Sequence, residues 1–286
     1  MCQSSPAISR AQDRDRGGPV SRPKPFVETV EVISNREICP GVHSIVLVAP
    51  RIAKTILPGQ FIHLDIDKDA LTLRRPLSVY KTDGEKIEIL YQIVGVGTDM
   101  LSKMTTSDTM SAVGPLGRDW PVKAEAKRAL LVAGGLGAAP LGMLTEKLRA
   151  QGTQIYFAQG STTEDRLIAR DAFAVEVDEH AIATDDGSCG VCGFVTAPVK
   201  TFIDDILFDI AYVCGPEPMQ RGVVDLLKTK HIETYVSLER LMACGIGACL
   251  SCVVPTINGL KRACVDGPVF NAEEVLWNEA VESRVH

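Results

Sequence analysis

Hydrophobic and polar residues alternate in short runs over the first part of the chain, starting at residues 26–32. An alternation of period two predicts a strand with one buried face. Further runs of this type cover residues 44–48, 60–66, 77–80, 86–94 and 109–113. Turn-forming pairs such as Pro40-Gly41 and Asp83-Gly84 separate them. The pattern predicts a small antiparallel barrel or sandwich, interrupted by a short helix at 98–104.

The pattern changes after Trp120. Residues 129–133 form a continuous apolar run, as expected for a strand that is buried on both faces. A glycine-rich loop and a helical stretch to residue 150 follow it. Further predicted strands at 154–158, 181–184 and 210–213 alternate with helical stretches. This alternation predicts a parallel sheet with crossover helices.

Composition and charge limit the class of protein. The chain has 286 residues, of which 45% are hydrophobic and 23% charged, so it is globular and long enough for two domains. Its net charge of −6, without a basic stripe, argues against a nucleic-acid partner. No apolar run reaches the ~20 residues of a membrane span, and residues 1–24 lack the apolar core of an export signal. We therefore expect a flexible tail at 1–24, no membrane association and a cytoplasmic, reducing compartment.

Four cysteines near the C-terminus carry the sharpest chemical signal, because their spacing is C-x4-C-x2-C-x11-C. Thiolates at C-x4-C-x2-C spacing are the ligands of plant-type [2Fe–2S] clusters. Gly245 and Gly247 lie in the first interval, where they let backbone N–H groups turn toward the sulfurs. A structural zinc site and unrelated core cysteines are the alternatives, although zinc sites usually contain two short C-x2-C pairs. The predicted cluster ligands are Cys244, Cys249, Cys252 and Cys264.

A second C-x2-C pair, Cys189 and Cys192, has a less specific signal. It is open to interpretation as a redox pair or as half of a metal site. Gly193 follows it, in place of the helix that usually accompanies a redox pair. Cys2 and Cys39 are interpreted as ordinary thiols. The odd total of nine cysteines argues against a secreted disulfide framework.

Two glycine-containing loops follow predicted strands in the second part of the chain, at residues 134–140 and 214–219. In open α/β sheets, ligands bind beyond the carboxyl ends of strands, where backbone amides reach a pyrophosphate. The loops therefore predict a dinucleotide site, with plain tight turns as the alternative.

The first part of the chain adds a second set of anion-binding features. Arg74 and Arg75 open a predicted strand, and the glycine-containing residues 94–98 precede the short helix. A guanidinium and free backbone amides both suit a pyrophosphate. A solvated arginine and a helix cap are the alternatives, but combined with the nucleotide loops and the cysteines these features favour a flavin.

The order of these motifs, R-P-x-S, G-x-G-T, G-G-x-G-x-x-P, C-G-P-x-P-M and the cysteine loop, resembles the ferredoxin reductase family of flavoproteins. Residues 239–252 are more specific and resemble the electron transfer subunits of NAD-dependent dihydroorotate dehydrogenases. The resemblance covers about residues 26–272 and implies a β-barrel joined to an α/β domain. The expected units are an antiparallel FAD-binding barrel at 25–122, a Rossmann-like, parallel-sheet NAD domain at 123–236, a [2Fe–2S] segment at 237–272 and a tail at 273–286.

The resemblance also implies roles for individual residues. The expected FAD ligands are Arg75, Pro76, Leu77, Ser78, Leu90, Tyr91, Gln92, Gly97 and Thr98, with Arg75 on the pyrophosphate and Ser78 near the isoalloxazine. The expected nicotinamide nucleotide site contains Gly134, Gly135, Gly137, Pro140, Cys214, Gly215 and Pro216. Leu77 stands where many relatives have an aromatic residue, and the chain ends in Arg284-Val285-His286 without a C-terminal aromatic. The cluster loop is therefore expected to cover the flavin.

The function that the resemblance implies is electron transfer in pyrimidine (UMP) biosynthesis. An FMN-containing partner subunit oxidises dihydroorotate, and electrons pass through the [2Fe–2S] cluster and FAD to NAD+, in a heterotetramer of two chains of each kind. A reductase subunit that serves a ferredoxin, sulfur or hydrogenase partner is the alternative, followed by a zinc-stabilised binding module. No catalytic residue is assigned, because no residue must abstract a proton from a substrate carbon. Acids and hydroxyls at 159–165 favour NAD, whereas Arg166 leaves NADP open.

Overall fold

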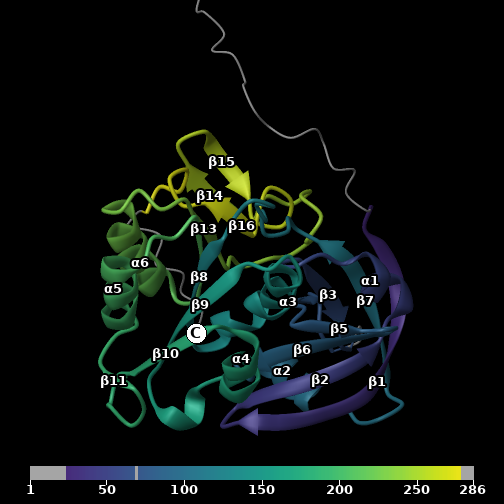
Figure 1. The fold of residues 1–286 in the computed structure, drawn as a ribbon. Coiled ribbons are helices and arrows are strands. Elements are labelled where there is room, and N and C mark those ends of the chain that lie inside the picture. The colour runs from purple at the N-terminus through teal and green to yellow at the C-terminus, as the bar shows by residue number, and fades with distance from the viewer. Residues whose placement is uncertain (1–23, 68–69, 278–286) are drawn as a thin grey trace, which may run out of the picture.

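The computed structural model describes residues 24–67 and 70–277, which form two seven-stranded sheets and a two-stranded hairpin (Figure 1). Residues 1–23, which include Cys2 and nearly all of the predicted N-terminal tail, lie outside the described residues. The same holds for Arg284-Val285-His286. Among the described residues, no helix has the length and hydrophobicity of a membrane span.

The first sheet is antiparallel in all its pairings, with the strand order β4-β3-β7-β1-β2-β6-β5. Its strands are β1 (Phe26–Cys39), β2 (Val42–Val48), β3 (Phe61–Asp65), β4 (Arg75–Ser78), β5 (Lys81–Asp83), β6 (Lys86–Gln92) and β7 (Thr109–Leu116). Two short helices, α1 (Pro50–Thr55) and α2 (Val96–Ser102), connect them. Apolar side chains such as Val30, Ile45 and Ile89 fill its interior and are fully buried. The predicted antiparallel, barrel-like unit is confirmed.

Strand β1 is longer than predicted, because the run at 26–32 continues to Cys39. Register shifts between Val32 and Ser34 and between Glu37 and Cys39 mark irregularities in its pairing with β2. A bulge interrupts the strict alternation of faces, so period two no longer identifies the strand beyond it. The predicted run at 77–80 is displaced in a similar way, since β4 starts at Arg75 and Tyr80 lies between β4 and β5.

Helix α1 was not predicted, because its N-terminal donors are satisfied by a residue far away in the sequence. The two carboxylate oxygens of Glu28, on β1, accept hydrogen bonds from the N–H groups of Arg51 and Ile52, both at 3.0 Å. A carboxylate that accepts from first-turn N–H groups replaces the usual local N-cap. The local sequence shows only Pro50 as a start signal.

The second sheet has the order β11-β10-β9-β8-β12-β13-β16. Its strands are β8 (Arg128–Gly134), β9 (Gln154–Ser161), β10 (Glu179–Thr184), β11 (Val191–Cys192), β12 (Ile210–Cys214), β13 (Thr234–Ser237) and β16 (Val269–Asn271). All neighbours are parallel except β13 and β16. The predicted parallel sheet is confirmed, and β13 and the antiparallel edge strand β16 extend it. Because β16 comes from the predicted cluster segment, this sheet continues beyond residue 236.

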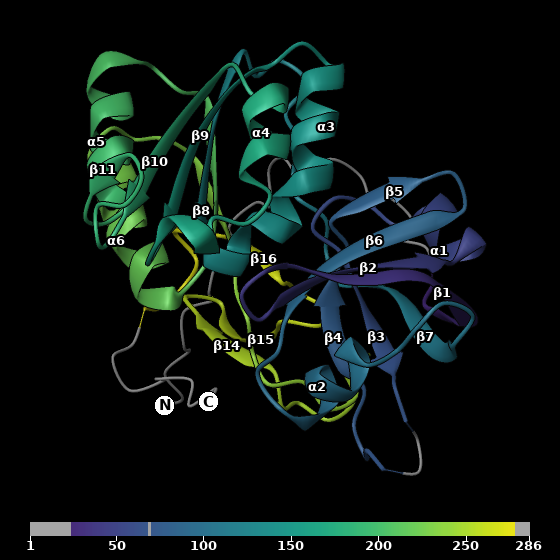
Figure 2. The ribbon, with the colours of Figure 1, turned by 90° about the horizontal axis from the view of Figure 1, so that it is seen from below.

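Helices cover both faces of the second sheet (Figure 2). The helical elements are η1 (Gly135–Leu141), α3 (Gly142–Ala150), η2 (Glu164–Arg166), α4 (Arg170–Glu176), α5 (Thr196–Asp205) and α6 (Glu217–Lys228). Leu144 of α3 and Phe173 of α4 pack on one face, and Val199 of α5 and Val223 of α6 pack on the other.

The two sheets share buried cores and do not meet only at their surfaces. Trp120, which is 1% exposed, donates its indole N–H to the Pro140 carbonyl oxygen at 2.9 Å and packs edge-on against Tyr212. On another side, Phe61 of β3 lies in the same core as Val236 of β13 and the side chains of Cys252 and Cys264. The cysteine segment, with the hairpin of β14 (Val253–Thr256) and β15 (Gly259–Arg262), is therefore anchored to both sheets.

Candidate functional site

The loop that begins at Cys244 is folded around sulfur atoms. The thiol sulfur of Cys244 accepts hydrogen bonds from the backbone N–H groups of Ala248 at 3.3 Å and Cys249 at 3.4 Å. Gly245 and Gly247 have φ values of +70° and +84°, a region that favours glycine and lets the chain turn back on itself. Inward N–H groups of this kind stabilise charge on ligand sulfurs.

Interactions link the four cysteines in a series, from Cys249 to Cys244, from Cys244 to Cys264 and from Cys264 to Cys252. Cys264 has a pKa that is raised to about 12 by burial and by a hydrogen bond with Cys252, and it also lies close enough to Cys244 to feel its charge. The pKa of Cys249 is lowered to about 6, first by hydrogen bonds from Ser251. Within residues 24–67 and 70–277, no group of three or more His, Cys, Asp or Glu side chains is already placed to hold a metal ion. The observations that fit a cluster are the N–H groups that point at the Cys244 sulfur and the interactions among the thiols.

One side of the cysteine loop is held by protein and the other is open. Cys252 and Cys264 are each 2% exposed, and Arg262 donates to the Gly247 carbonyl oxygen at 3.1 Å. The loop's apolar side chains on the other side are exposed: Leu241, Ile246 and Leu250. We call these three residues the cysteine-loop face.

His63 was not identified from the sequence, and the structure places it against the cysteine loop. It lies on β3, is 0% exposed, and neither of its ring nitrogens has a hydrogen-bond partner among the described residues. A Cβ atom on Gly245 would lie 2.7 Å from the His63 ring, so the ring packs directly on the loop backbone. Burial, together with the charge of Arg74, lowers the pKa of His63 to about 4. A single histidine within an ordinary strand run has no spacing pattern that could reveal this role.

Two groups of predicted FAD residues, β4 and the loop that contains Gly97 and Thr98, lie against each other in the first sheet. Arg75 to Ser78 form β4, which pairs with β3, and the Arg75 side chain lies so close over Gly97 that a Cβ atom there would collide with it. Thr98 accepts hydrogen bonds from the N–H groups of Val94 at 2.9 Å and Gly95 at 3.2 Å and so closes the loop before α2. A guanidinium beside a glycine-rich loop fits a pyrophosphate.

Other predicted FAD residues are turned in different directions. Tyr91 is fully buried inside the first sheet and donates its hydroxyl to Asn35 at 2.9 Å, so only its backbone is available. Leu77 also packs against that core, whereas Leu90 faces the second sheet. Only some members of the predicted set can therefore present side chains to a flavin.

The two glycine loops of the second sheet pack backbone against backbone. They follow β8 and β12, which are neighbours in the sheet and pair Ala133 with Cys214. A Cβ on Gly137 would collide with the Cys214 carbonyl oxygen, and one on Gly215 would lie 2.9 Å from the Gly134 nitrogen. The predicted nucleotide residues Gly134, Gly135, Gly137, Cys214, Gly215 and Pro216 are thus brought together at the carboxyl ends of adjacent strands.

Two members of this set serve packing. Pro140 is buried within the 3-10 helix η1, and its carbonyl oxygen accepts the Trp120 hydrogen bond. Cys214 is 2% exposed, and burial raises the pKa of its thiol, so it stays protonated.

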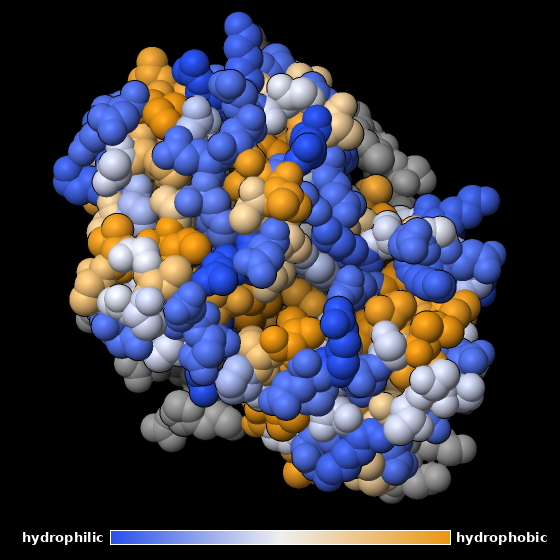
Figure 3. Space-filling model, turned by 60° about the horizontal axis from the view of Figure 1, so that its bottom comes forward, coloured by the Kyte–Doolittle hydropathy of each residue, from blue (hydrophilic) through white to orange (hydrophobic). Residues whose placement is uncertain are grey.

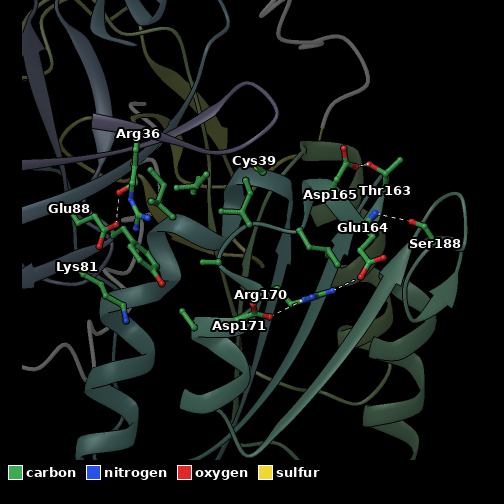
Figure 4. A pocket seen from close by; sticks show the side chains of 18 of the residues that line it. Arg36, Cys39, Lys81, Glu88, Thr163, Glu164, Asp165, Arg170, Asp171 and Ser188 are labelled. Carbon is green, nitrogen blue, oxygen red and sulfur yellow. Dashed lines mark hydrogen bonds and ion pairs between the residues drawn. The ribbon is translucent and has the colours of Figure 1, made fainter. Parts of the chain in front are cut away.

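A pocket of about 970 Å³ lies between the two sheets, close to the carboxyl ends of β9 and β10 (Figure 4). One wall carries Arg36, Cys39 and Glu88 of the first sheet, and the other carries Glu164 and Arg170. The space-filling view shows apolar side chains exposed in the hollow between the two halves, with charged ones beside them (Figure 3). The volume of the pocket is in the range of small-molecule binding sites. Only the wall that follows β9 was indicated by the sequence. The wall formed by the first sheet depends on how the two sheets pack together.

The charged residues of the pocket are mostly paired. Arg170 donates to Glu164 at 2.7 Å and also bonds Asp171, and Ser44 donates to Glu88 at 2.5 Å. Tyr80 also lines the pocket, and its buried hydroxyl has no hydrogen-bond partner among residues 24–67 and 70–277. Among the described residues that line the pocket are Glu164 and Asp165, whereas Arg166 is not one of them.

The second cysteine pair lies beside this pocket and not in the cysteine loop. The sulfur of Cys189 accepts a long hydrogen bond of 3.8 Å from Arg170, and Cys192 ends the short edge strand β11. Both are free thiols. Cys39, interpreted from the sequence as an ordinary thiol, lines the pocket, and burial raises its pKa.

Comparisons with known proteins agree with this arrangement. A family model described as the iron-sulfur cluster binding domain of dihydroorotate dehydrogenase B matches residues 239–276. A protein of Clostridium acetobutylicum is 39% identical over 224 residues, covering 78% of this chain and 88% of its own length. A protein of Geobacillus sp. (strain WCH70) is 37% identical over 257 residues, covering 87% and 98%. Both are named dihydroorotate dehydrogenase B (NAD(+)), electron transfer subunit.

Solved structures show the same fold. The structure of an NADH-dependent reduced ferredoxin-NADP oxidoreductase, described in connection with flavin-based electron bifurcation, matches with a TM-score of 0.81 and 30% identity, covering 91% of this chain and 92% of that one. The cytochrome b5 reductase domain of Ulva prolifera nitrate reductase matches with a TM-score of 0.61 at 17% identity, over 73% of this chain and 94% of that one. The expected ferredoxin reductase-like architecture is confirmed.

Proposed function

The chain belongs to the family of dihydroorotate dehydrogenase B (NAD(+)) electron transfer subunits, and we propose that it passes electrons from a dihydroorotate-oxidising subunit through a [2Fe–2S] cluster and FAD to NAD+. Family membership confirms the predicted class, an NAD-linked oxidoreductase subunit. The chain's own part is to hold three redox groups in order.

The observation that carries the proposal is the contact between the cysteine loop and β3. Gly245 packs on His63, and β3 pairs directly with β4, which carries Arg75 and Ser78. A cluster held by this loop and a flavin held by β4 would therefore lie in neighbouring parts of the fold. When bound, FAD joins the one-electron chemistry of the cluster to the two-electron reduction of NAD+.

The chain's residues have distinct parts in this proposal. Cys244, Cys249, Cys252 and Cys264 hold the cluster. Arg75 and the loop closed by Thr98 would hold the FAD pyrophosphate, and Ser78 would contribute to the isoalloxazine site. The paired glycine loops of β8 and β12 would hold the nicotinamide half of NAD at the carboxyl ends of these strands, where Gly135 has open space beside its backbone.

The pocket between the sheets is proposed to hold the adenosine half of NAD. Glu164 and Asp165 follow β9, where an acid accepts hydrogen bonds from ribose hydroxyls and disfavours a 2′-phosphate. Arg170 is held by Glu164 and Asp171, which further supports NAD over NADP.

The partner is proposed to be the FMN-containing dihydroorotate dehydrogenase catalytic subunit, in a heterotetramer with two copies of each chain. The relatives are named as electron transfer subunits, and such a subunit requires a separate electron donor. The cysteine-loop face suits such a partner, because exposed apolar side chains next to a redox centre mark a contact surface. A cytoplasmic location, and domain limits at 25–122, 123–236 and 237–272, are further parts of the proposal.

The experiment that tests this function compares two assays on the loaded chain. NADH with an artificial electron acceptor is expected to turn over with the chain alone, because the FAD and NAD sites are both within it. Dihydroorotate with NAD+ is expected to react only after the FMN subunit is added. The second candidate function is a ferredoxin-linked reductase, which the likeness to the ferredoxin-NADP oxidoreductase favours. If a ferredoxin supported electron flow and the FMN subunit did not, this second function would replace the proposal.

Leu241→Glu is expected to weaken binding of the FMN subunit by at least about tenfold, which corresponds to 1.4 kcal/mol. Leu241 is 66% exposed on the cysteine-loop face, and a carboxylate there would lose its hydration in the interface. Titration calorimetry with the partner measures the change. Leu207→Glu is the control, since Leu207 is 85% exposed just before β12, outside the cysteine segment. Equal affinity of both variants would place the interface elsewhere.

A further inference from the structure

His63 stands out among the buried polar groups. Its side chain is fully buried in β3, and both ring nitrogens lack a hydrogen-bond partner among the described residues. A neutral imidazole always carries one N–H donor and one acceptor nitrogen. A buried donor without an acceptor bears the full cost of its desolvation, so native proteins rarely leave one.

The neighbours of the ring show where an acceptor must come from. Arg74 has hydrogen-bond donors but no acceptor. The ring of Phe61, whose centre lies 5.8 Å from that of His63, has no acceptor either. Pro76 lies opposite on β4 and Val113 opposite on β7, and both have apolar side chains. The ring also packs on Gly245, with an ideal Cβ there 2.8 Å from Nδ1 and 3.1 Å from Nε2. Gly245 directly follows Cys244, so the ring faces the loop whose sulfurs are the strong acceptors of this region.

We propose that His63 donates its imidazole N–H to a sulfur of the [2Fe–2S] cluster held by the cysteine loop, and that this hydrogen bond raises the reduction potential of the cluster. The inference rests on the proposed function, because it requires the cluster. His63 is a positioning and tuning residue here and does not bind iron.

The direction of the effect follows from charge. Reduction adds one negative charge to the cluster, and an N–H dipole aimed at a sulfur stabilises the reduced state more than the oxidised one. Burial keeps His63 neutral at pH 7, so the donor is a dipole and not a full charge. Strand β3 is paired on both sides, with β4 and β7, and therefore holds the ring in a fixed place.

The test is an EPR-monitored redox titration of the full chain loaded with cluster and FAD. His63→Leu keeps the bulk of the side chain and removes the donor. At a fixed ambient potential, its ratio of reduced to oxidised cluster is expected to fall about tenfold, which is about 59 mV for a one-electron couple. His63→Gln, which restores an N–H donor, is expected to recover part of the shift. A His63→Leu potential equal to that of the unchanged protein would overturn the inference.

His180→Leu is the matched control. His180 lies on β10, and burial lowers its pKa to about 4 as well, but its neighbours are Phe157 and Gln159 of the second sheet. Its replacement is expected to leave the cluster potential unchanged. His180 is only half-buried, so it is matched to His63 by its lowered pKa and its place on a strand. A shift as large as that of His63→Leu would show that loss of a histidine far from the cysteine loop also disturbs the cluster, and would overturn the specific role of His63.

A second measurement does not depend on the stability of a variant. The chain has five histidines, and labelling them with nitrogen-15 allows pulsed EPR to detect a histidine nitrogen coupled to the reduced cluster. We expect one such coupling in the unchanged protein, and its absence would overturn the inference. Iron and sulfide analysis separates the two proposals: without any cluster the proposed function fails, whereas a cluster without a histidine coupling overturns only the role of His63.

Discussion

Replacing Cys249 with serine is expected to remove the [2Fe–2S] cluster and to stop electron flow from the FMN subunit, while the chain stays folded and retains FAD. Of the four predicted ligands, Cys249 is classed as exposed, so the substitution leaves no cavity in the core. Its pKa of about 6, lowered first by hydrogen bonds from Ser251, already favours the thiolate that binds iron. A serine hydroxyl cannot supply this ligand at neutral pH.

The expected loss of activity is larger than that caused by replacing a residue that only hydrogen-bonds to a metal ligand. Such changes typically cost 10- to 100-fold in metal affinity or activity, so loss of a ligand should reduce dihydroorotate-dependent NAD+ reduction by more than about 100-fold. NADH oxidation with an artificial acceptor should continue. Iron and sulfide content and the visible spectrum measure the cluster. Cys192→Ser is the control, because Cys192 is also an exposed free thiol but lies on β11. A Cys249→Ser protein with its full cluster spectrum would contradict the assignment.

The cluster cysteines could be identified from the sequence because most of them lie close together along the chain. Cys244, Cys249 and Cys252 lie within one loop, so their spacing alone indicates what they can bind. The glycine loops were identifiable for the same reason, since each directly follows a strand whose apolar run is continuous. Four strands of the second sheet, β8, β9, β10 and β12, followed from this regularity. The short edge strand β11 and the strands β13 and β16, which pair beside the cysteine segment, did not.

Features that depend on tertiary contacts were not predictable from the sequence. Glu28 caps α1 from another strand, and the bulges in β1 interrupt the alternation by which strands are identified. The first wall of the pocket exists only because β1, β2 and β6 face the second sheet. His63 has a special environment because Gly245, far away in the chain, packs on it.

The residue pattern alone did not distinguish two adjacent arginines as the ligand of the FAD pyrophosphate, and only the resemblance assigned this role to Arg75. The two side chains differ in their contacts. Arg74 donates to the Ser111 carbonyl oxygen at 2.9 Å and to its hydroxyl at 3.1 Å, and it pairs with Asp65 at 3.2 Å. It is fully engaged within the protein. Arg75 donates to the Leu73 carbonyl oxygen and lies over Gly97, next to the loop closed by Thr98. Arg75 is therefore the residue available for a phosphate.

Arg75→Ala is expected to weaken FAD binding by about 10- to 100-fold while the chain stays folded. A charge-assisted hydrogen bond contributes about 1.5–3 kcal/mol, and each 1.4 kcal/mol is a factor of ten in affinity. Fluorescence of FAD released on dilution measures the change, and circular dichroism checks the fold. Arg74→Ala, the control, is expected to lower stability through its lost bonds to Ser111 and Asp65 but to retain FAD at matched folded concentration. If Arg74→Ala released FAD and Arg75→Ala did not, the pyrophosphate would have to lie on the Arg74 side of β4, away from Gly97, and the proposed FAD site would be wrong.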